Sequence, residues 1–415
     1  MNSSKHIASR AGRRPFLSTL SGTLLVALAF AASSGTALAA NDQPIRIGAL
    51  MPLSGAGGEF GRNMLAAAKA AVADINAAGG PLGRKIELVQ ENTETNPEQA
   101  VRAAKKLVDV NKVIAIFGTW ASGVTLAVAP IAQENHIVEM STSGSSRITN
   151  IQKKGFIYRT EPDDLLFGKA YAEFGLRQGW KTASVLGLNV PFTDTTVAAF
   201  RERFESQGGK VLAYVTYNEN QTTFRSEVVK ALSVKPDFTH ISGYGPDLTA
   251  ILKTAYESGM KATFLVPGFA VTDSLIKDAG PAAEGVMLVE EGVDQGSNAY
   301  KRVQKALGGD RYYSFAAQAY DQIQLLALAI EAGGEAGGAS INEHLRAISG
   351  PPGTKVSSFT EGAKILRQGG KIDYEGASGP IDFNADGSIV TANFRVSQIK
   401  DGKVVPIHEL SNVKF

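Results

Sequence analysis

The chain has 415 residues and contains no cysteine. Disulfide bonds, thiol catalysis and cysteine metal sites are therefore excluded, as is a lipid-modified cysteine at a leader cleavage site. Stability has to come from buried cores. About 376 residues follow the leader described below, which is more than one core usually serves, so two domains are expected.

Groups suited to catalysis are also scarce. Four histidines follow the leader, each isolated from the others and from an obvious acidic partner: His136, His240, His344 and His408. No nucleophile elbow, Walker A or dinucleotide-binding motif is present. The acidic pairs Asp163-Asp164 and Glu290-Glu291 are adjacent, so their side chains do not face one another, and solvated or capping roles are favoured. We expect no enzyme, cofactor or metal site, although the fold alone does not exclude an enzyme.

Residues 1–39 have the pattern of a signal peptide. A basic segment ends at Arg13-Arg14, Leu17–Ala32 is apolar but short for a bilayer, and Ala37-Leu38-Ala39 fits the cleavage rule. The arginine pair also resembles a twin-arginine signal, although Gly12 stands where Ser or Thr is usual; an ordinary secretory signal is the alternative. Cleavage after about Ala39 predicts a periplasmic protein.

Charge gives no indication of a nucleic-acid partner. The leader holds four of the 42 basic residues and none of the 40 acidic ones, which leaves 38 basic against 40 acidic residues. No basic face for nucleic acid is therefore expected. No second apolar run reaches membrane length.

The remaining chain alternates between strand and helix patterns. In Ile45–Gly80 an alternating apolar strand ends in a glycine-rich loop, which leads into an amphipathic helix that stops at Gly79-Gly80-Pro81. A loop of this kind at a helix start is suited to holding a small ligand. Further strands are predicted at 86–90, 113–117, 137–140, 183–188, 211–217, 238–242 and 263–266. Further helices are predicted at 97–108, 124–134, 193–207, 224–232, 247–258, 300–307 and 315–332.

This alternation predicts an α/β fold with parallel sheets and helices on both faces. Because the rhythm restarts near residue 183, we expect two doubly wound lobes. The apolar stripe of residues 315–332 should pack on a sheet. Towards the end, Ile381–Phe383 and Ala392–Ile399 are predicted to form a hairpin through the turn Asn384–Gly387.

Several runs resemble the periplasmic solute-binding proteins of ABC importers, in the branched-chain (Leu/Ile/Val) amino acid-binding group with the type I periplasmic binding fold. They are IRIGALMPLSG, DINAAGG, NPEQAVRAAKKLV, IFGTWASGVTLAVAPIAQ, MSTSGSSRIT, YRTEPDD, AEGV and AYDQIQLLALAIEAGG. Each run alone is weak, but their order and spacing cover nearly all of the chain beyond the leader.

The resemblance implies two lobes joined by a three-segment hinge, with the ligand in the cleft between them. We place the crossings near Glu161–Asp164, Leu288–Glu291 and Ala392–Val396. Lobe 1 would comprise 41–162 plus 290–391, and lobe 2 would comprise 163–289 plus 392–415.

The resemblance also implies a set of ligand contacts. Ser122, with Trp120 and Ala121, would hold the ligand carboxylate, although Ser122 could instead be a plain helix N-cap. Ser143, Gly144 and Ser145 would lie near the ammonium group, or form a simple turn. Asp164 could contact the ligand or cap a helix. The other expected contacts, whose aromatic members could instead be core residues, are Phe60, Phe192, Tyr244, Gly268 and Phe269.

The sequence departs from the family pattern at the cation end of this site. Gly268 stands where branched-chain receptors place a glutamate that pairs with the ligand ammonium. A buried ammonium without a carboxylate partner is costly. We therefore expect a carboxylate ligand with an apolar or aromatic body, such as an aromatic or hydroxy acid, which need not carry an α-ammonium.

The predicted function is capture of this small molecule for the membrane permease subunits of an ABC transporter, by a protein expected to be monomeric. A soluble sensory receptor of the same fold, acting on a regulator, is the alternative.

Overall fold

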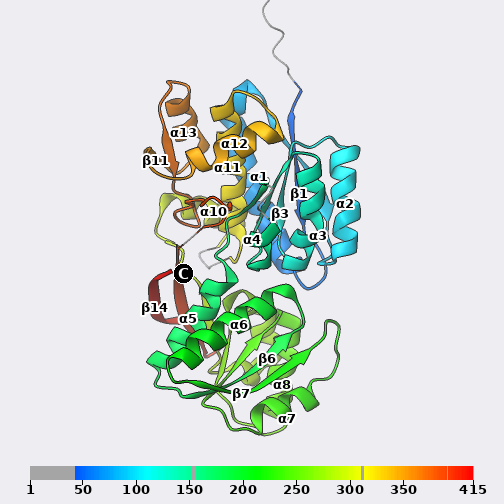
Figure 1. The fold of residues 1–415 in the computed structure, drawn as a ribbon, viewed down its shortest axis with the longest axis vertical. Coiled ribbons are helices and arrows are strands. Elements are labelled where there is room, and N and C mark those ends of the chain that lie inside the picture. Colours follow the sequence, from blue (N-terminus) through cyan, green and yellow to red (C-terminus); the bar gives the residue numbers. More distant parts are fainter. Residues whose placement is uncertain (1–42, 152–154, 310–312, 390, 415) are drawn as a thin grey trace, which may run out of the picture. The chain divides into compact units, whose positions relative to one another are not determined.

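The computed structural model describes residues 43–151, 155–309, 313–389 and 391–414 (Figure 1). The signal peptide and its cleavage site lie outside the described residues and stay predictions. From Gln43 onward the chain forms one compact unit, which is built on two main sheets. None of the helices in the described ranges is both long and apolar enough to cross a bilayer.

The first sheet has five parallel strands in the order β2–β1–β3–β4–β5. The strands are β1 (Ile45–Met51), β2 (Ile86–Asn92), β3 (Ala115–Thr119), β4 (Val138–Ser141) and β5 (Ile157–Arg159). The helices between them are α1 (Gly58–Ala77), α2 (Pro97–Asp109), α3 (Ser122–Glu134) and α4 (Arg147–Ile151). Local signals set their ends: Asn96, for example, accepts a hydrogen bond from the Gln99 N–H at 2.9 Å and caps α2 ahead of Pro97.

Helices cover both faces of this sheet. Successive strand residues point to opposite sides, so Ile47 joins the core with α1 and α11 (Ala316–Gly333), whereas Leu50 joins the core with α2 and α3. Figure 1 shows α2 and α3 on one side of β1 and β3, with α1 and α11 on the other. Helix α11 contacts β3, as predicted, and also packs along α1. The same part of the chain includes α10 (Asn298–Leu307), α12 (Gly338–Ile348), α13 (Phe359–Leu366) and the parallel pair β11 (Thr354–Val356) and β12 (Ile372–Tyr374).

The second sheet has seven strands in the order β14–β13–β10–β9–β8–β6–β7. The strands are β6 (Thr182–Leu188), β7 (Lys210–Tyr217), β8 (Phe238–Ser242), β9 (Phe264–Pro267), β10 (Met287–Glu291), β13 (Thr391–Lys400) and β14 (Lys403–Lys414). The first five of these are parallel, whereas β13 runs antiparallel to both β10 and β14.

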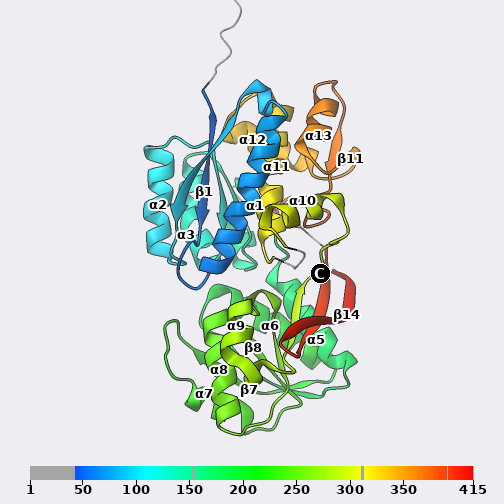
Figure 2. The same ribbon diagram turned by 180° about the vertical axis from the view of Figure 1, so that it is seen from behind.

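Helices again lie on both faces. One core contains α5 (Asp164–Arg177) and α6 (Pro191–Ser206), and the other contains α7 (Arg225–Leu232), α8 (Gly245–Glu257) and α9 (Asp273–Ala279). Figure 2 shows α8 and α9 in front of this sheet. The predicted fold class, an α/β chain with two doubly wound parallel-sheet lobes, is confirmed, with an antiparallel edge added to the second sheet.

Within the described residues the chain passes between the sheets three times. The first passage lies between β5 and α5 and contains the predicted crossing Glu161–Asp164. The predicted crossings Leu288–Glu291 and Ala392–Val396 lie instead inside the paired strands β10 and β13, so these passages occur after Glu291 and before Thr391. The residue ranges assigned to the two lobes stay a prediction.

The predicted C-terminal hairpin is wrong. Strand β13 is present, but its hairpin partner is β14, and Ile381–Phe383 forms no strand beyond an isolated bridge from Phe383 to Ile389. The pattern of β14 is interrupted by Pro406, which marks a run as a poor strand. Proline is tolerated here because β14 is the edge strand of its sheet.

A buried arginine ties the first passage to its surroundings. Arg159, at the end of β5, forms an ion pair with Asp163, and both side chains are almost fully buried. Its guanidinium also donates to the carbonyl oxygens of Gly144 (3.0 Å) and Ser145 (3.1 Å) and to the hydroxyl of Ser388. Asp163 in turn caps α5 by accepting the Leu165 N–H at 2.9 Å.

We predict that Arg159→Met lowers the free energy of unfolding by about 3–5 kcal/mol, because it leaves the Asp163 carboxylate buried without its partner. The matched control is Arg46→Met, whose exposed pair with Glu87 should contribute less than about 1 kcal/mol. Urea denaturation of the three proteins measures the difference. Equal, small losses for both variants would contradict the structural role of Arg159.

Candidate functional site

The site begins at the carboxyl end of the first sheet. Strand β3 ends at Thr119, Trp120 and Ala121 form the turn, and α3 starts at Ser122. Ala121 is the N-cap of α3 and supplies no side-chain cap. The positive end of α3 and the Ser122 hydroxyl can therefore serve an anion, as the first N–H groups of a helix have no partner within it.

Aromatic rings from both sheets meet at this helix start. The Trp120 ring is 5% exposed and lies 5.0 Å from the Phe60 ring and 5.1 Å from the Tyr244 ring, between centroids. Phe315 and Phe269 follow at 5.8 and 6.2 Å from Trp120. These rings come from α1, the β3–α3 turn, the start of α8, the turn after β9, and the residue before α11.

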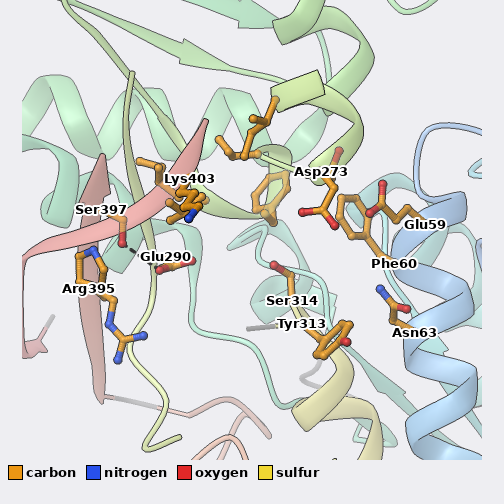
Figure 3. Close-up of a pocket in the computed structure, with 18 of the residues that line it drawn as sticks. Glu59, Phe60, Asn63, Asp273, Glu290, Tyr313, Ser314, Arg395, Ser397 and Lys403 are labelled. Atoms are coloured by element: carbon orange, nitrogen blue, oxygen red, sulfur yellow. Dashed lines mark hydrogen bonds between the residues drawn. The ribbon is translucent and has the colours of Figure 1, made fainter. Parts of the chain in front are cut away.

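The rings enclose a cavity of about 30 Å³. The lining residues are Trp120, Ala121, Ser122, Thr142, Gly144, Glu161, Phe192, Tyr244, Phe269 and Phe315. This volume holds about one or two water molecules, so a larger ligand requires the rings to move apart. Phe269 also lines a neighbouring, more polar chamber of about 440 Å³, together with Phe60 and Gly268. Figure 3 shows Phe60 beside Glu59 and Asp273 on one side of this chamber, and Glu290, Arg395 and Lys403 on the other.

Two buried carboxyl groups meet next to the smaller cavity. The side-chain amide of Gln318 donates to Glu161 at 3.1 Å and also to Glu291. Burial raises the pKa of Glu161 well above its usual 4.5, and the nearby charge of Glu291 raises it further. Burial also raises the pKa of Glu291, with an added contribution from Asp321. Glu161 is the one ionisable carboxyl group among the residues that line this cavity.

The geometry agrees with comparisons to known proteins. The sequence model of the periplasmic binding protein family matches residues 44–403. The chain belongs to this family. It is 27% identical over 330 residues to the leucine-, isoleucine-, valine-, threonine- and alanine-binding protein of Pseudomonas aeruginosa, which covers 78% of this chain and 87% of the relative.

Two solved structures share the fold. A leucine binding protein from Thermotoga maritima superposes with a TM-score of 0.76 at 24% identity, covering 88% of this chain and 99% of its own. A solute binding protein of an ABC transporter from R. palustris, in complex with benzoate, gives a TM-score of 0.75 at 24% identity, covering 90% and 98%. Membership of the periplasmic binding protein family implies a periplasmic location.

Seven of the twelve residues predicted to contact the ligand line the smaller cavity: Trp120, Ala121, Ser122, Gly144, Phe192, Tyr244 and Phe269. Phe60 and Gly268 line the larger chamber. The other three, Ser143, Ser145 and Asp164, are buried behind the lining. Contact with a ligand stays a prediction for all twelve.

The buried serines support the loops rather than face the cavity. Ser143 donates to the Trp120 carbonyl at 2.7 Å and shares a hydrogen bond with Thr125. The Ser145 N–H donates to the Ser122 hydroxyl oxygen at 3.2 Å. The helix N-cap interpretation of Ser122 is wrong, because Ser122 is the first helical residue of α3 and its oxygen fixes the neighbouring loop.

Asp164 has a similar supporting role. It accepts the Ser146 N–H at 3.1 Å and a hydrogen bond from Thr195. Burial, and then the charge of Asp163, raises its pKa. The alternative that Asp164 caps the helix is also wrong, since Asp163 is the N-cap of α5.

Three lining residues were not predicted from the sequence: Thr142, Glu161 and Phe315. Phe315 was assigned to the following helix, but it precedes α11 with φ at +64°, a strained conformation that aims its ring towards Trp120. The sequence predicted Glu161 only as part of the crossing Glu161–Asp164 between the lobes, and not as a ligand contact. Its place in the YRTEPDD run was the available signal, but its burial depends on α11, which is far away in sequence.

The glycine loop before α1 makes room for Trp120. A Cβ atom at Gly57 would lie 2.7 Å from the Trp120 ring and 2.8 Å from Pro52. The loop was predicted to hold a small ligand. In the structure, the lack of a side chain at Gly57 leaves room for the Trp120 ring, which lines the cavity.

Gly268 faces away from the rings. A Cβ atom at this position would lie 2.4 Å from the Glu290 Cβ and 3.0 Å from the Val289 carbonyl oxygen. A side chain at position 268 would therefore point into β10 and collide with it. The glycine at this position fits the packing of the loop and does not by itself define the charge of the ligand.

We predict that Gly268→Ala lowers the free energy of unfolding by about 1–3 kcal/mol, because its methyl group overpacks the contact with Glu290. Gly123→Ala is the matched control, since its Cβ would meet only Pro97 at 3.6 Å and alanine favours the helix by up to about 1 kcal/mol. Thermal or urea unfolding compares the two. Unchanged stability of Gly268→Ala would show that β10 yields at this position.

Proposed function

We propose that this chain is the solute-binding component of an ABC importer. It captures a small carboxylate-bearing solute between its two lobes and delivers it to a membrane permease. The observation that carries this proposal is the uncapped start of α3, where Ser122 and the Trp120 ring line one cavity. A helix start binds the anionic end of a ligand, and the aromatic walls cover its apolar body.

The aromatic lining supports a ligand with an apolar or aromatic body. Five of the ten residues that line the cavity are aromatic: Trp120, Phe192, Tyr244, Phe269 and Phe315. The relatives bind ligands of this general kind: the Pseudomonas relative is named for apolar amino acids and threonine, and the R. palustris structure holds benzoate. Both ligand classes carry a carboxylate, which is the shared chemistry that we assign to this protein.

The remaining parts of the proposal follow from the sequence. Residues 1–39 are removed after export to the periplasm, and the protein works as a monomer. Lobe 1 comprises 41–162 plus 290–391, and lobe 2 comprises 163–289 plus 392–415. Closure of two lobes on a solute gives the permease a shape that it can distinguish from the empty protein.

We predict that carboxylates with apolar bodies raise the melting temperature, whereas their methyl esters do not. The panel contains leucine, phenylalanine, benzoate and cinnamate, each with its ester, because ligands that bind only the folded state stabilise it. Ser122→Ala should weaken the best binder by about 10- to 150-fold, the value of a hydrogen bond to a charged group.

The control for this variant is Ser206→Ala, at the exposed end of α6, which should bind like the unaltered protein. Equal stabilisation by acids and esters, or full affinity in Ser122→Ala, would contradict the anion site at α3.

A further inference from the structure

Two polar side chains, Glu161 and Thr142, belong to the otherwise mostly apolar wall of the smaller cavity. Glu161 lines the cavity and is 5% exposed. Thr142 also lines it and is 1% exposed, and within the described part of the chain its hydroxyl oxygen has no hydrogen-bond partner. The side-chain oxygen of Gln318, which lies behind Glu161, is likewise without a partner there. Buried polar atoms without partners are rare and call for an explanation.

Among the described residues, few protein groups donate hydrogen bonds to these side chains. A single amide nitrogen, that of Gln318, donates to both Glu161 and Glu291. Arg159 lowers the pKa of Glu161 through its charge, but its guanidinium donates to Asp163, Ser388 and backbone carbonyls instead. The other titratable group that faces Glu161 is Tyr171 of α5, which is neutral.

We propose that Glu161 and Thr142 form a cation subsite, which takes the ammonium group of a zwitterionic ligand whose carboxylate lies at the start of α3. This inference rests on the proposed function. It assigns the ammonium to a carboxylate on the passage between β5 and α5, and not to the loop after β9 where Gly268 stands. The ligand class becomes an amino acid or a related ammonium carboxylate.

Three physical effects support this assignment. A buried carboxylate is stable only when a cation or several hydrogen bonds compensate its charge, and an ammonium supplies both. An ammonium carries three N–H donors, enough for both the Glu161 carboxylate and the Thr142 hydroxyl oxygen. Trp120 and Phe315 line the same cavity, and the face of an aromatic ring attracts a cation.

The raised pKa of Glu161 fits the same scheme. Burial and the neighbouring Glu291 raise the pKa of Glu161, so its charged form is disfavoured in the empty site. An arriving ammonium reverses this preference, because it stabilises the carboxylate form. Binding of an ammonium group should therefore lower the pKa of Glu161.

Matched ligand pairs that differ only in the ammonium group test the subsite. They are phenylalanine with 3-phenylpropanoate, and leucine with 4-methylpentanoate, measured by calorimetry at pH 7.5 on the full protein. In the unaltered protein we expect the amino acid of a pair to bind about 30-fold or more tightly than its deaminated partner. Glu161→Gln keeps the size of the side chain and should remove this preference, by weakening the amino acid and leaving the deaminated acid within about threefold.

Glu290→Gln is the matched control. Glu290 neighbours Glu291 on β10 but lines the larger chamber, so its variant should keep the preference for the amino acid. The subsite is overturned if the deaminated acid binds as tightly as the amino acid in the unaltered protein, or if Glu161→Gln weakens both alike. Both of these results leave the proposed function intact. If no carboxylate of the panel binds, the proposed function fails and the subsite fails with it.

Discussion

One amide group holds together the two chain passages on which the site is built. Gln318 of α11 donates to Glu161, on the passage that follows β5, and to Glu291, at the end of β10. Burial raises the pKa of both carboxyl groups; the charge of Glu291 raises the pKa of Glu161 further, and the charge of Asp321 raises that of Glu291. Helix α11 is buried over almost its whole length, and this packing holds the Gln318 amide between the two carboxyl groups. In the proposal above, the ammonium group of the ligand supplies a positive charge beside these two carboxyl groups.

The rest of the site follows from the ends of the strands. Parallel strands direct their carboxyl ends to one edge of a sheet, where the following loops gather. In the first sheet this edge supplies the uncapped start of α3 and the loop that carries Thr142. In the second sheet it supplies the Tyr244 and Phe269 rings. The start of α3, the aromatic rings and the Glu161 carboxyl group thus reach one cavity from separate elements. The contribution of each can be tested on its own.

The fold could be predicted from the sequence because apolar residues recur at different spacings in strands and in helices, and the two patterns alternate along the chain. The strand at Phe238–Ser242 was predicted with the bounds that the structure has. The C-terminal hairpin failed, because Pro406 hides an edge strand whose partner supplies the pairing. Most of the cavity wall was predicted through the loops that follow strands. Ser143 and Asp164 lie behind the cavity lining, which sequence spacing could not show, because it does not tell which way a side chain in a tight loop points. Glu161 was missed as a lining residue for a related reason, since the helix that packs against it, α11, lies about 150 residues later in the chain.

The central claim is that the ammonium group of the ligand lies beside the Glu161 carboxyl group, while the ligand carboxylate lies at the start of α3. Calorimetry of phenylalanine or leucine binding at pH 7 is repeated in phosphate and Tris buffers. Because the two buffers differ in ionisation heat, the difference in binding heat gives the number of protons released or taken up on binding. An ammonium beside Glu161 lowers a pKa that burial has raised, so the account predicts net release of protons on binding. Binding with no proton release, or with proton uptake, would contradict it.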